Sequence, residues 1–150
     1  MRSFFLLCAL VAVCNAVYTG VAYYDINAGC TGVAYRTSYT QTASCTPIPC
    51  TKNTDYQLSI LQTCVSAIPQ TKGTLEISSY PSHDCSGTPD VGVYNLNTCL
   101  PDEQGQFGYL TCNAQYICSD SACKSGCTAT PFSDSCTATP RDSTTYKCIP

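Results

Sequence analysis

The sequence predicts a small all-β protein that is cross-linked by disulfides and works outside the reducing cytosol. Three observations support this prediction. The chain of 150 residues contains 14 cysteines, only 11% of its residues are charged, and short β-prone runs alternate with turns rich in Gly, Pro, Asn and Asp. Cysteine at this density is typical of small exported domains, whose thin hydrophobic cores need covalent support.

Residues 1–16 have the features of a secretory signal peptide. Arg2 gives a positive start, residues 4–13 form an apolar run, and small residues precede a cleavage site after Ala16. The apolar run is too short to cross a bilayer, which takes about 20 residues. We therefore expect a mature chain that begins at Val17, is secreted to the extracellular space and has no membrane span.

Loss of the signal peptide would leave an even number of cysteines, and we expect all of them to form disulfides. They are Cys30, Cys45, Cys50, Cys64, Cys85, Cys99, Cys112, Cys118, Cys123, Cys127, Cys136 and Cys148. Such a set allows roughly ten thousand pairings, so the connectivity does not follow from spacing. Cys123 and Cys127 have a metal-like spacing, but an oxidising compartment favours disulfides over zinc. No metal site and no cofactor is expected.

The charge balance excludes two classes of partner. Cleavage after Ala16 leaves six basic and ten acidic residues. A chain with this negative balance has no electrostatic footprint for nucleic acid or for an anionic membrane.

A shared cysteine pattern predicts two tandem β pseudo-repeats, at residues 17–68 and 74–112. Each segment contains Tyr, then Cys-Thr/Ser-Gly, then Tyr and then Cys-x-Pro, and the shift is 55 residues at the first cysteine, Cys30 or Cys85. Cys50 has no counterpart in the second segment. Each unit is expected to contain three strands, with the third strand of the second unit within residues 107–112, and the two units to pack as two sheets or as one continuous sheet.

Period-two patterns support the strands of these units. Leu75 and Ile77 alternate with polar residues in the run Thr74–Tyr80, as expected for a strand with one buried face. The run 55–68 also fits a helix, because Leu58, Leu61 and Val65 have helical spacing. We expect a strand there, since matching units should share a fold.

Residues 113–150 are expected to form an irregular Cys/Thr-rich tail that is ordered by disulfides or by a partner. The sequence Cys-Thr-Ala-Thr-Pro occurs twice in this tail, beginning at Cys127 and Cys136. Ser/Thr-rich segments with proline are typical of O-glycosylated spacers in secreted proteins. The candidate O-glycosylation sites are Thr128, Thr130, Thr137 and Thr139.

No set of residues predicts catalysis, and the chain is expected not to be an enzyme. His83, the one histidine, lies in a Pro-Ser-His-Asp turn, where a solvated histidine is the expected interpretation. A glycosidase would need two carboxylates held across a cleft. The acidic residues lie mainly in turns, where solvated charges are expected: Asp25, Asp55, Asp84, Asp90, Asp102, Glu103, Asp120, Asp134 and Asp142.

Two functional hypotheses follow from these patterns. The first is an extracellular structural or assembly protein, such as a coat, matrix or filament component, that self-associates through sheet edges or intermolecular disulfides. The alternative is a monomeric secreted binding module, lectin-like, inhibitor-like or toxin-like, whose partner is an extracellular protein or glycan. Assembly predicts cysteines used between chains, whereas a binding module predicts that all twelve pair within one chain.

Overall fold

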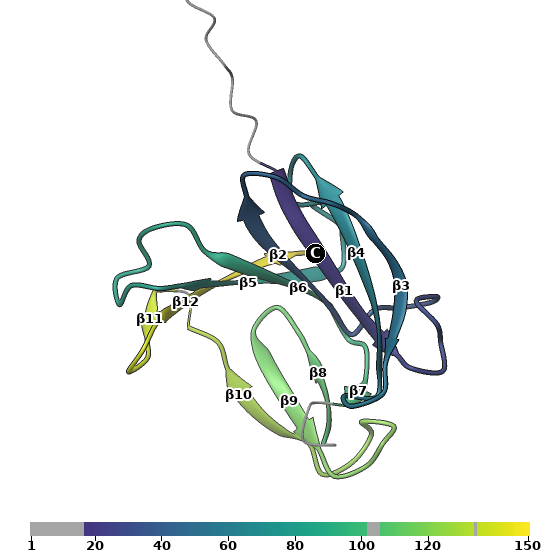
Figure 1. Ribbon diagram of the computed structural model, residues 1–150. Helices are drawn as coiled ribbons and strands as arrows, with labels where there is room; N and C mark the ends of the chain where they lie inside the picture. Colours follow the sequence, from purple (N-terminus) through teal and green to yellow (C-terminus); the bar gives the residue numbers. More distant parts are fainter. Residues whose placement is uncertain (1–16, 102–105, 134) are drawn as a thin grey trace, which may run out of the picture.

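The structure is a computed structural model that describes residues 17–101, 106–133 and 135–150. The predicted signal peptide lies outside these residues. The described residues form twelve strands and no helix (Figure 1). They also contain six disulfides. The prediction of a small, disulfide-rich, all-β protein is therefore confirmed.

The larger sheet has eight antiparallel strands in the order β11-β12-β5-β6-β2-β1-β4-β3. Figure 1 shows that this sheet is strongly twisted, so that β5 and β1 cross at a wide angle. The strands are β1 (Val17–Asp25), β2 (Arg36–Thr42), β3 (Ile48–Asn53), β4 (Leu58–Val65), β5 (Thr74–Tyr80), β6 (Asp90–Asn95), β11 (Thr137–Ala138) and β12 (Ser143–Ile149).

The smaller sheet has four strands in the order β10-β9-β8-β7. These are β7 (Leu100–Pro101), β8 (Phe107–Leu110), β9 (Ala114–Cys118) and β10 (Thr128–Pro131). The ring of Phe132, just after β10, stacks on Tyr146 of β12 with centroids 4.4 Å apart. The Cys112–Cys148 disulfide adds a covalent link between the two sheets.

The hydrophobic core is thin, as the composition predicts. Leu75 of β5 is fully buried, and the other buried apolar side chains are Ala22, Tyr39, Val91, Ala114 and Cys118. Burial of so little apolar surface stabilises a chain of this size only modestly. The six disulfides restrict the unfolded chain and supply much of the remaining stability.

The eight-stranded sheet consists of two halves that repeat one strand order about an approximate twofold axis. The first half reads β3-β4-β1-β2 and the second reads β11-β12-β5-β6. The halves meet where β2 and β6 pair antiparallel, with Ser38 opposite Gly92 at the centre of the pairing. β1 and β5 therefore run in opposite directions, and their C-terminal ends lie at opposite ends of the sheet.

Buried serines occupy the same place in both halves. Ser59 lies opposite Tyr24, and Ser143 lies opposite Tyr80. Both serines are fully buried. Each hydroxyl donates to the carbonyl oxygen two residues beyond the tyrosine: Ser59 to Ile26 at 3.2 Å, and Ser143 to Ser82 at 2.7 Å. The two halves therefore share side-chain contacts as well as strand order.

Two disulfides also occur at equivalent places. Cys30–Cys50 and Cys85–Cys136 each tie the loop after the first strand of a half to its edge strand or the residue before it. Cys64 and Cys148 lie opposite the equivalent residues Thr19 and Leu75. The remaining two disulfides, Cys99–Cys123 and Cys118–Cys127, belong to the smaller sheet and its loops.

These halves differ from the tandem units expected from the sequence, and the pseudo-repeat at residues 17–68 and 74–112 is not confirmed. The run 107–112, where the third strand of the second unit was expected, contributes β8 to the smaller sheet, and β12 takes the place beside β5. In the sequence pattern Cys50 had no counterpart. In the structure its counterpart is Cys136, because the two cysteines form equivalent disulfides at the edge strands of the two halves. The sequence match was misleading because the smaller sheet is inserted within the second half.

The expectation of an irregular tail is wrong. Residues 113–150 contain the four strands from β9 to β12, and β12 is an interior strand of the larger sheet. Apolar periodicity did not reveal these strands because few of their side chains are large aliphatics, and threonine is the most frequent residue. Threonine and tyrosine favour strands through side-chain packing, so a strand does not need an aliphatic stripe. The strand expected within residues 55–68 is confirmed as β4.

Candidate binding site between two turns of the larger sheet

A hollow lies between the β5–β6 loop (residues 81–89) and the β11–β12 turn (residues 139–142). Its volume is about 260 Å³, and its lining residues are Ser79, Tyr80, Pro81, Thr88, Asp90 and Asp142. Five of these residues belong to the β5–β6 hairpin, and Asp142 comes from the distant β11–β12 turn. The fold therefore adds the second carboxylate to a hollow that one hairpin begins.

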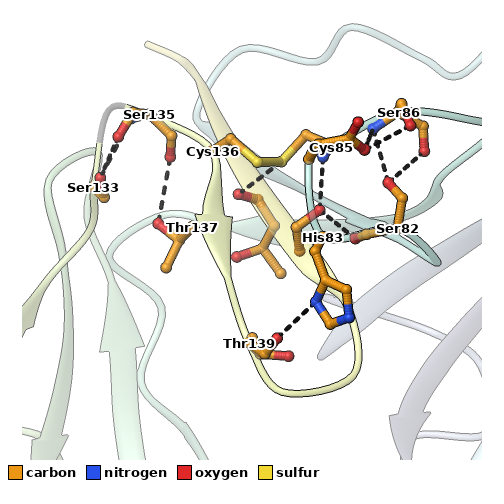
Figure 2. Close-up of a disulfide and its surroundings, with 12 residues drawn as sticks. Ser82, His83, Cys85, Ser86, Ser133, Ser135, Cys136, Thr137 and Thr139 are labelled. Carbon is orange, nitrogen blue, oxygen red and sulfur yellow. Dashed lines mark hydrogen bonds between the residues drawn. A yellow bond between two sulfur atoms is a disulfide. The ribbon is translucent and has the colours of Figure 1, made fainter.

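The Cys85–Cys136 disulfide and a set of hydrogen bonds fasten the two turns (Figure 2). The Ser143 hydroxyl accepts the Cys85 N–H at 2.9 Å and donates to the Ser82 carbonyl at 2.7 Å. The His83 Nδ1 lies 3.0 Å from the Thr139 carbonyl oxygen. A carbonyl oxygen only accepts, so this nitrogen carries the proton and donates. The walls of the hollow are thus held in place before any ligand arrives.

Short polar side chains stiffen the β5–β6 loop itself. Asp84 accepts from the Ser86 hydroxyl at 2.6 Å and from the Ser86 N–H at 3.2 Å. The Ser86 hydroxyl is the main reason why the pKa of Asp84 lies below its ordinary value. Ser82 and Ser86 exchange two further hydrogen bonds, of 2.8 and 2.9 Å. Local bonds of this kind fix a turn that apolar burial does not hold.

Two carboxylates give the hollow its chemical character. Asp90 Oδ1 accepts from the Thr40 hydroxyl at 2.7 Å. Asp142 Oδ1 accepts from the Thr139 hydroxyl. Among the described residues, the Oδ2 atoms of both aspartates have no hydrogen-bond or ionic partner. The lining includes no basic residue. The hollow is therefore suited to a ligand that donates hydrogen bonds or carries positive charge.

The structure pairs all twelve cysteines expected to form disulfides. Cys123 is bonded to Cys99, and Cys127 to Cys118, so neither is a thiolate that could ligate zinc. Among residues 17–101, 106–133 and 135–150, no three His, Cys, Asp or Glu side chains gather where they could hold a metal ion.

The four candidate O-glycosylation sites fall in different environments. Thr128 and Thr130 lie exposed on β10, an edge strand of the smaller sheet. Thr137 lies exposed on β11 of the larger sheet, and its hydroxyl donates to the Ser135 carbonyl at 3.3 Å. The Thr139 hydroxyl is engaged within the β11–β12 turn, where it accepts from the Asp142 N–H at 3.1 Å. The two Thr-Ala-Thr runs are thus not a single surface.

Other residues considered for chemistry lie apart. The His83 Nδ1 contacts a backbone carbonyl oxygen. A catalytic histidine would instead contact a nucleophile. Asp25 accepts from the Tyr35 hydroxyl at 3.0 Å at the opposite end of the sheet. Asp120 accepts from the N–H groups of its own loop, and these hold its pKa below the ordinary value. Asp102, Glu103 and Asp134 lie outside the described residues.

The sequence did not single out Asp90 and Asp142, which it grouped with the solvated turn acids. Nothing in their local sequence marks them, because one follows a Thr-Pro pair and the other precedes a Ser-Thr-Thr run. Only the Cys85–Cys136 pairing would have shown that the two turns meet. That pairing is one of many that the cysteine spacing allows.

Comparisons with models of known protein families and with solved structures find no match to this chain. Within the described part of the chain, there is no helix with the length and apolar character needed to cross a membrane.

Proposed function

We propose that this protein is a secreted, monomeric binding module that takes its ligand in the hollow between the β5–β6 loop and the β11–β12 turn. The observation that carries this proposal is a fixed rim around an open, acidic hollow. A disulfide and part-buried hydrogen bonds already hold the rim, so little conformational freedom is lost on binding. Exposed loops on a rigid scaffold are the common place for a binding site.

The cysteine pairing supports a monomer that works outside the cytosol. All twelve cysteines of the described residues are bonded within the chain, so they leave no thiol for a link between chains. Disulfides at this density persist in oxidising compartments. Together with the signal-like first 16 residues, they support secretion.

The sheet edges support the same conclusion. Edge strand β3 contains Pro49 and a shift of register between Ile48 and Thr51. Edge strands β7 and β10 each end in proline, at Pro101 and Pro131, and β11 has two residues. Proline, bulges and short length all prevent a strand of another molecule from pairing with an edge.

Two measurements on secreted, non-reduced protein test the proposal. Light scattering should find a monomer. The ¹⁵N-labelled protein is then titrated with glucose, galactose, N-acetylglucosamine, N-acetylarginine amide and N-acetyllysine amide. We expect at least one probe to shift the amide signals of residues 79–90 and 139–143. Polymers in the first measurement, or no shift at the hollow with any probe, would overturn the proposal.

A specific observation favours assembly as a second candidate function. Three large apolar side chains are exposed in the first half of the larger sheet: Val33 by 57%, Ile48 by 45% and Tyr56 by 75%. Exposed apolar side chains that gather into a patch can mark a contact between copies of a chain, whereas single ones are common on monomers. The same light-scattering measurement separates the two candidates, because assembly through these residues predicts large species that persist without reduction.

A further inference from the structure

We infer that the hollow binds the guanidinium group of an arginine side chain on a partner protein. This inference rests on the proposed function and specifies its ligand. It comes from comparing the hollow with the equivalent place in the first half of the sheet, where the chain supplies its own guanidinium group.

The strand pairing identifies the equivalent residues. Ser79 lies opposite Asp90 in the second half, and Tyr23 lies opposite Arg36 in the first half. On the neighbouring strand at the other side, β12 places Thr144 opposite Ser79, and β4 places Ile60 opposite Tyr23. The buried serines lie opposite Tyr24 and Tyr80, so the preceding residues, Tyr23 and Ser79, are equivalent. Their partners across the sheet, Arg36 and Asp90, are therefore equivalent too.

The two places have different contents. In the first half, the guanidinium carbon of Arg36 lies 4.9 Å from the centroid of the Tyr23 ring. In the second half, Ser79 and Asp90 are smaller, and they line the open hollow instead. The framework thus holds a guanidinium group at one end of the sheet and leaves a space with two carboxylates at the other.

The groups around the hollow match the chemistry of arginine. A guanidinium group is planar, always charged and has five donors in a fixed fork. The Oδ2 atoms of Asp90 and Asp142 can each accept from it, and the hydroxyls of Ser79 and Thr88 are further acceptors on the lining. Pro81 offers an apolar surface to the aliphatic stem. Lysine has a compact, strongly hydrated charge and would satisfy fewer of these acceptors.

A partner protein is a better source of this group than free arginine. Free arginine carries a carboxylate, which would come close to the acidic hollow and to Asp84 on its rim. An arginine within a polypeptide has no such charge. The negative balance of the chain, with ten acidic residues, also attracts a basic partner over longer distances.

The test compares ligands that differ by one feature, using the ¹⁵N-labelled, disulfide-intact protein. N-acetylarginine amide should shift the signals of residues 79–90 and 142. The citrulline counterpart has the same shape without the charge, and it should bind about tenfold more weakly or not at all. N-acetyllysine amide should be intermediate, and higher salt should weaken the binding of both cations. Free arginine should bind more weakly than the blocked amide.

Matched variants connect the binding to the two carboxylates. Asp90→Asn and Asp142→Asn keep the side-chain shape, and each should weaken binding of the arginine amide by about tenfold. Asp55→Asn removes one negative charge from the first half of the sheet and should leave the affinity unchanged. The double variant Ser79→Tyr/Asp90→Arg copies the first-half arrangement into the hollow and should abolish binding. If that variant does not fold, the two asparagine variants still decide the question.

The possible outcomes separate this inference from the proposed function. If a saccharide binds at the hollow and the arginine amide does not, the arginine inference is overturned and the binding function stands. If the citrulline amide binds as well as the arginine amide, charge recognition is overturned. If free arginine binds more tightly than the blocked amide, the ligand is a small molecule and not a partner protein. If no probe binds at the hollow, both proposals fail.

Discussion

Ser143→Ala should destabilise the protein far more than the same change at its counterpart, Ser59. Both serines are fully buried, and both substitutions remove one hydroxyl. The Ser143 hydroxyl has two backbone partners, the Cys85 N–H at 2.9 Å and the Ser82 carbonyl at 2.7 Å. The Ser59 hydroxyl has one recorded partner, the Ile26 carbonyl at 3.2 Å. The two variants thus form a matched pair in which the number and length of the hydrogen bonds differ.

The magnitudes follow from these contacts. A buried backbone group that loses its partner costs about 1–3 kcal/mol. Ser143→Ala leaves two such groups, and because both hydrogen bonds are only part-buried we expect a loss in the lower part of the summed range, about 2–4 kcal/mol, in the free energy of unfolding. Ser59→Ala breaks one longer bond and should cost about 1 kcal/mol. In a domain of this size, 1 kcal/mol corresponds to a shift of roughly 4 °C in the melting temperature.

The assay is guanidinium unfolding of the non-reduced mature proteins, followed by circular dichroism, with the slope of the transition compared between variants. Hydrogen exchange should also become faster at the Cys85 amide in Ser143→Ala, because that N–H loses its acceptor. Equal destabilisation by the two substitutions would refute the reasoning, and so would an unchanged exchange rate at Cys85.

Three further predictions concern the disulfides and one titrating group. The mature protein should gain about 12 Da on reduction, two hydrogens for each of six disulfides, as measured by intact mass. Replacing both cysteines of Cys85–Cys136 by serine, which opens a span of 51 residues, should cost about 4 kcal/mol in a chemical unfolding experiment. The same change at Cys118–Cys127, with a span of 9, should cost about 2.6 kcal/mol; the reverse order would contradict the loop-entropy account. Burial, followed by the hydrogen bond to Asp25, raises the pKa of Tyr35 to about 12, so stability should be full below pH ~10 and fall as the pH rises toward ~12. Burial also raises the pKa of Tyr39, so ultraviolet titration of Tyr35→Phe should lose one tyrosine from the late transition. A single tyrosine transition near pH 10 in the parent protein would argue against this prediction.

Several strands could be predicted because their local patterns match their environment. The run Thr74–Tyr80 was predicted from alternation, and the structure has β5 at those residues, although burial does not alternate there, because Thr74, Leu75 and Glu76 are all buried. The disulfide-rich, all-β class followed from the cysteine count and the low charge. These features depend on composition and on neighbouring residues, which a single sequence displays directly.

The arrangement of the strands could not be predicted in the same way. The sequence predicted that residues 107–112 supply the third strand of the second unit, but the structure places β12 beside β5. Strand order depends on contacts between distant residues, and the Cys85–Cys136 link that brings the turns together is one of many equally allowed pairings. The edge strand Ile48–Asn53 was also missed, because its two prolines, Pro47 just before it and Pro49 within it, indicate a loop.

The approximate twofold axis places the two candidate functional surfaces at opposite ends of the larger sheet. β1 and β5 are separated by three antiparallel pairings, so they run in opposite directions. The turn that carries Tyr56 follows β3, and its counterpart, the turn that carries Asp142, follows β11. One end presents the exposed side chains of Val33 and Tyr56, and the other presents an acidic hollow. A substitution at either end therefore tests binding or assembly separately. The shared framework of buried serines and equivalent disulfides stays intact in both cases, so a loss of function at one end does not have to reflect a loss of the fold.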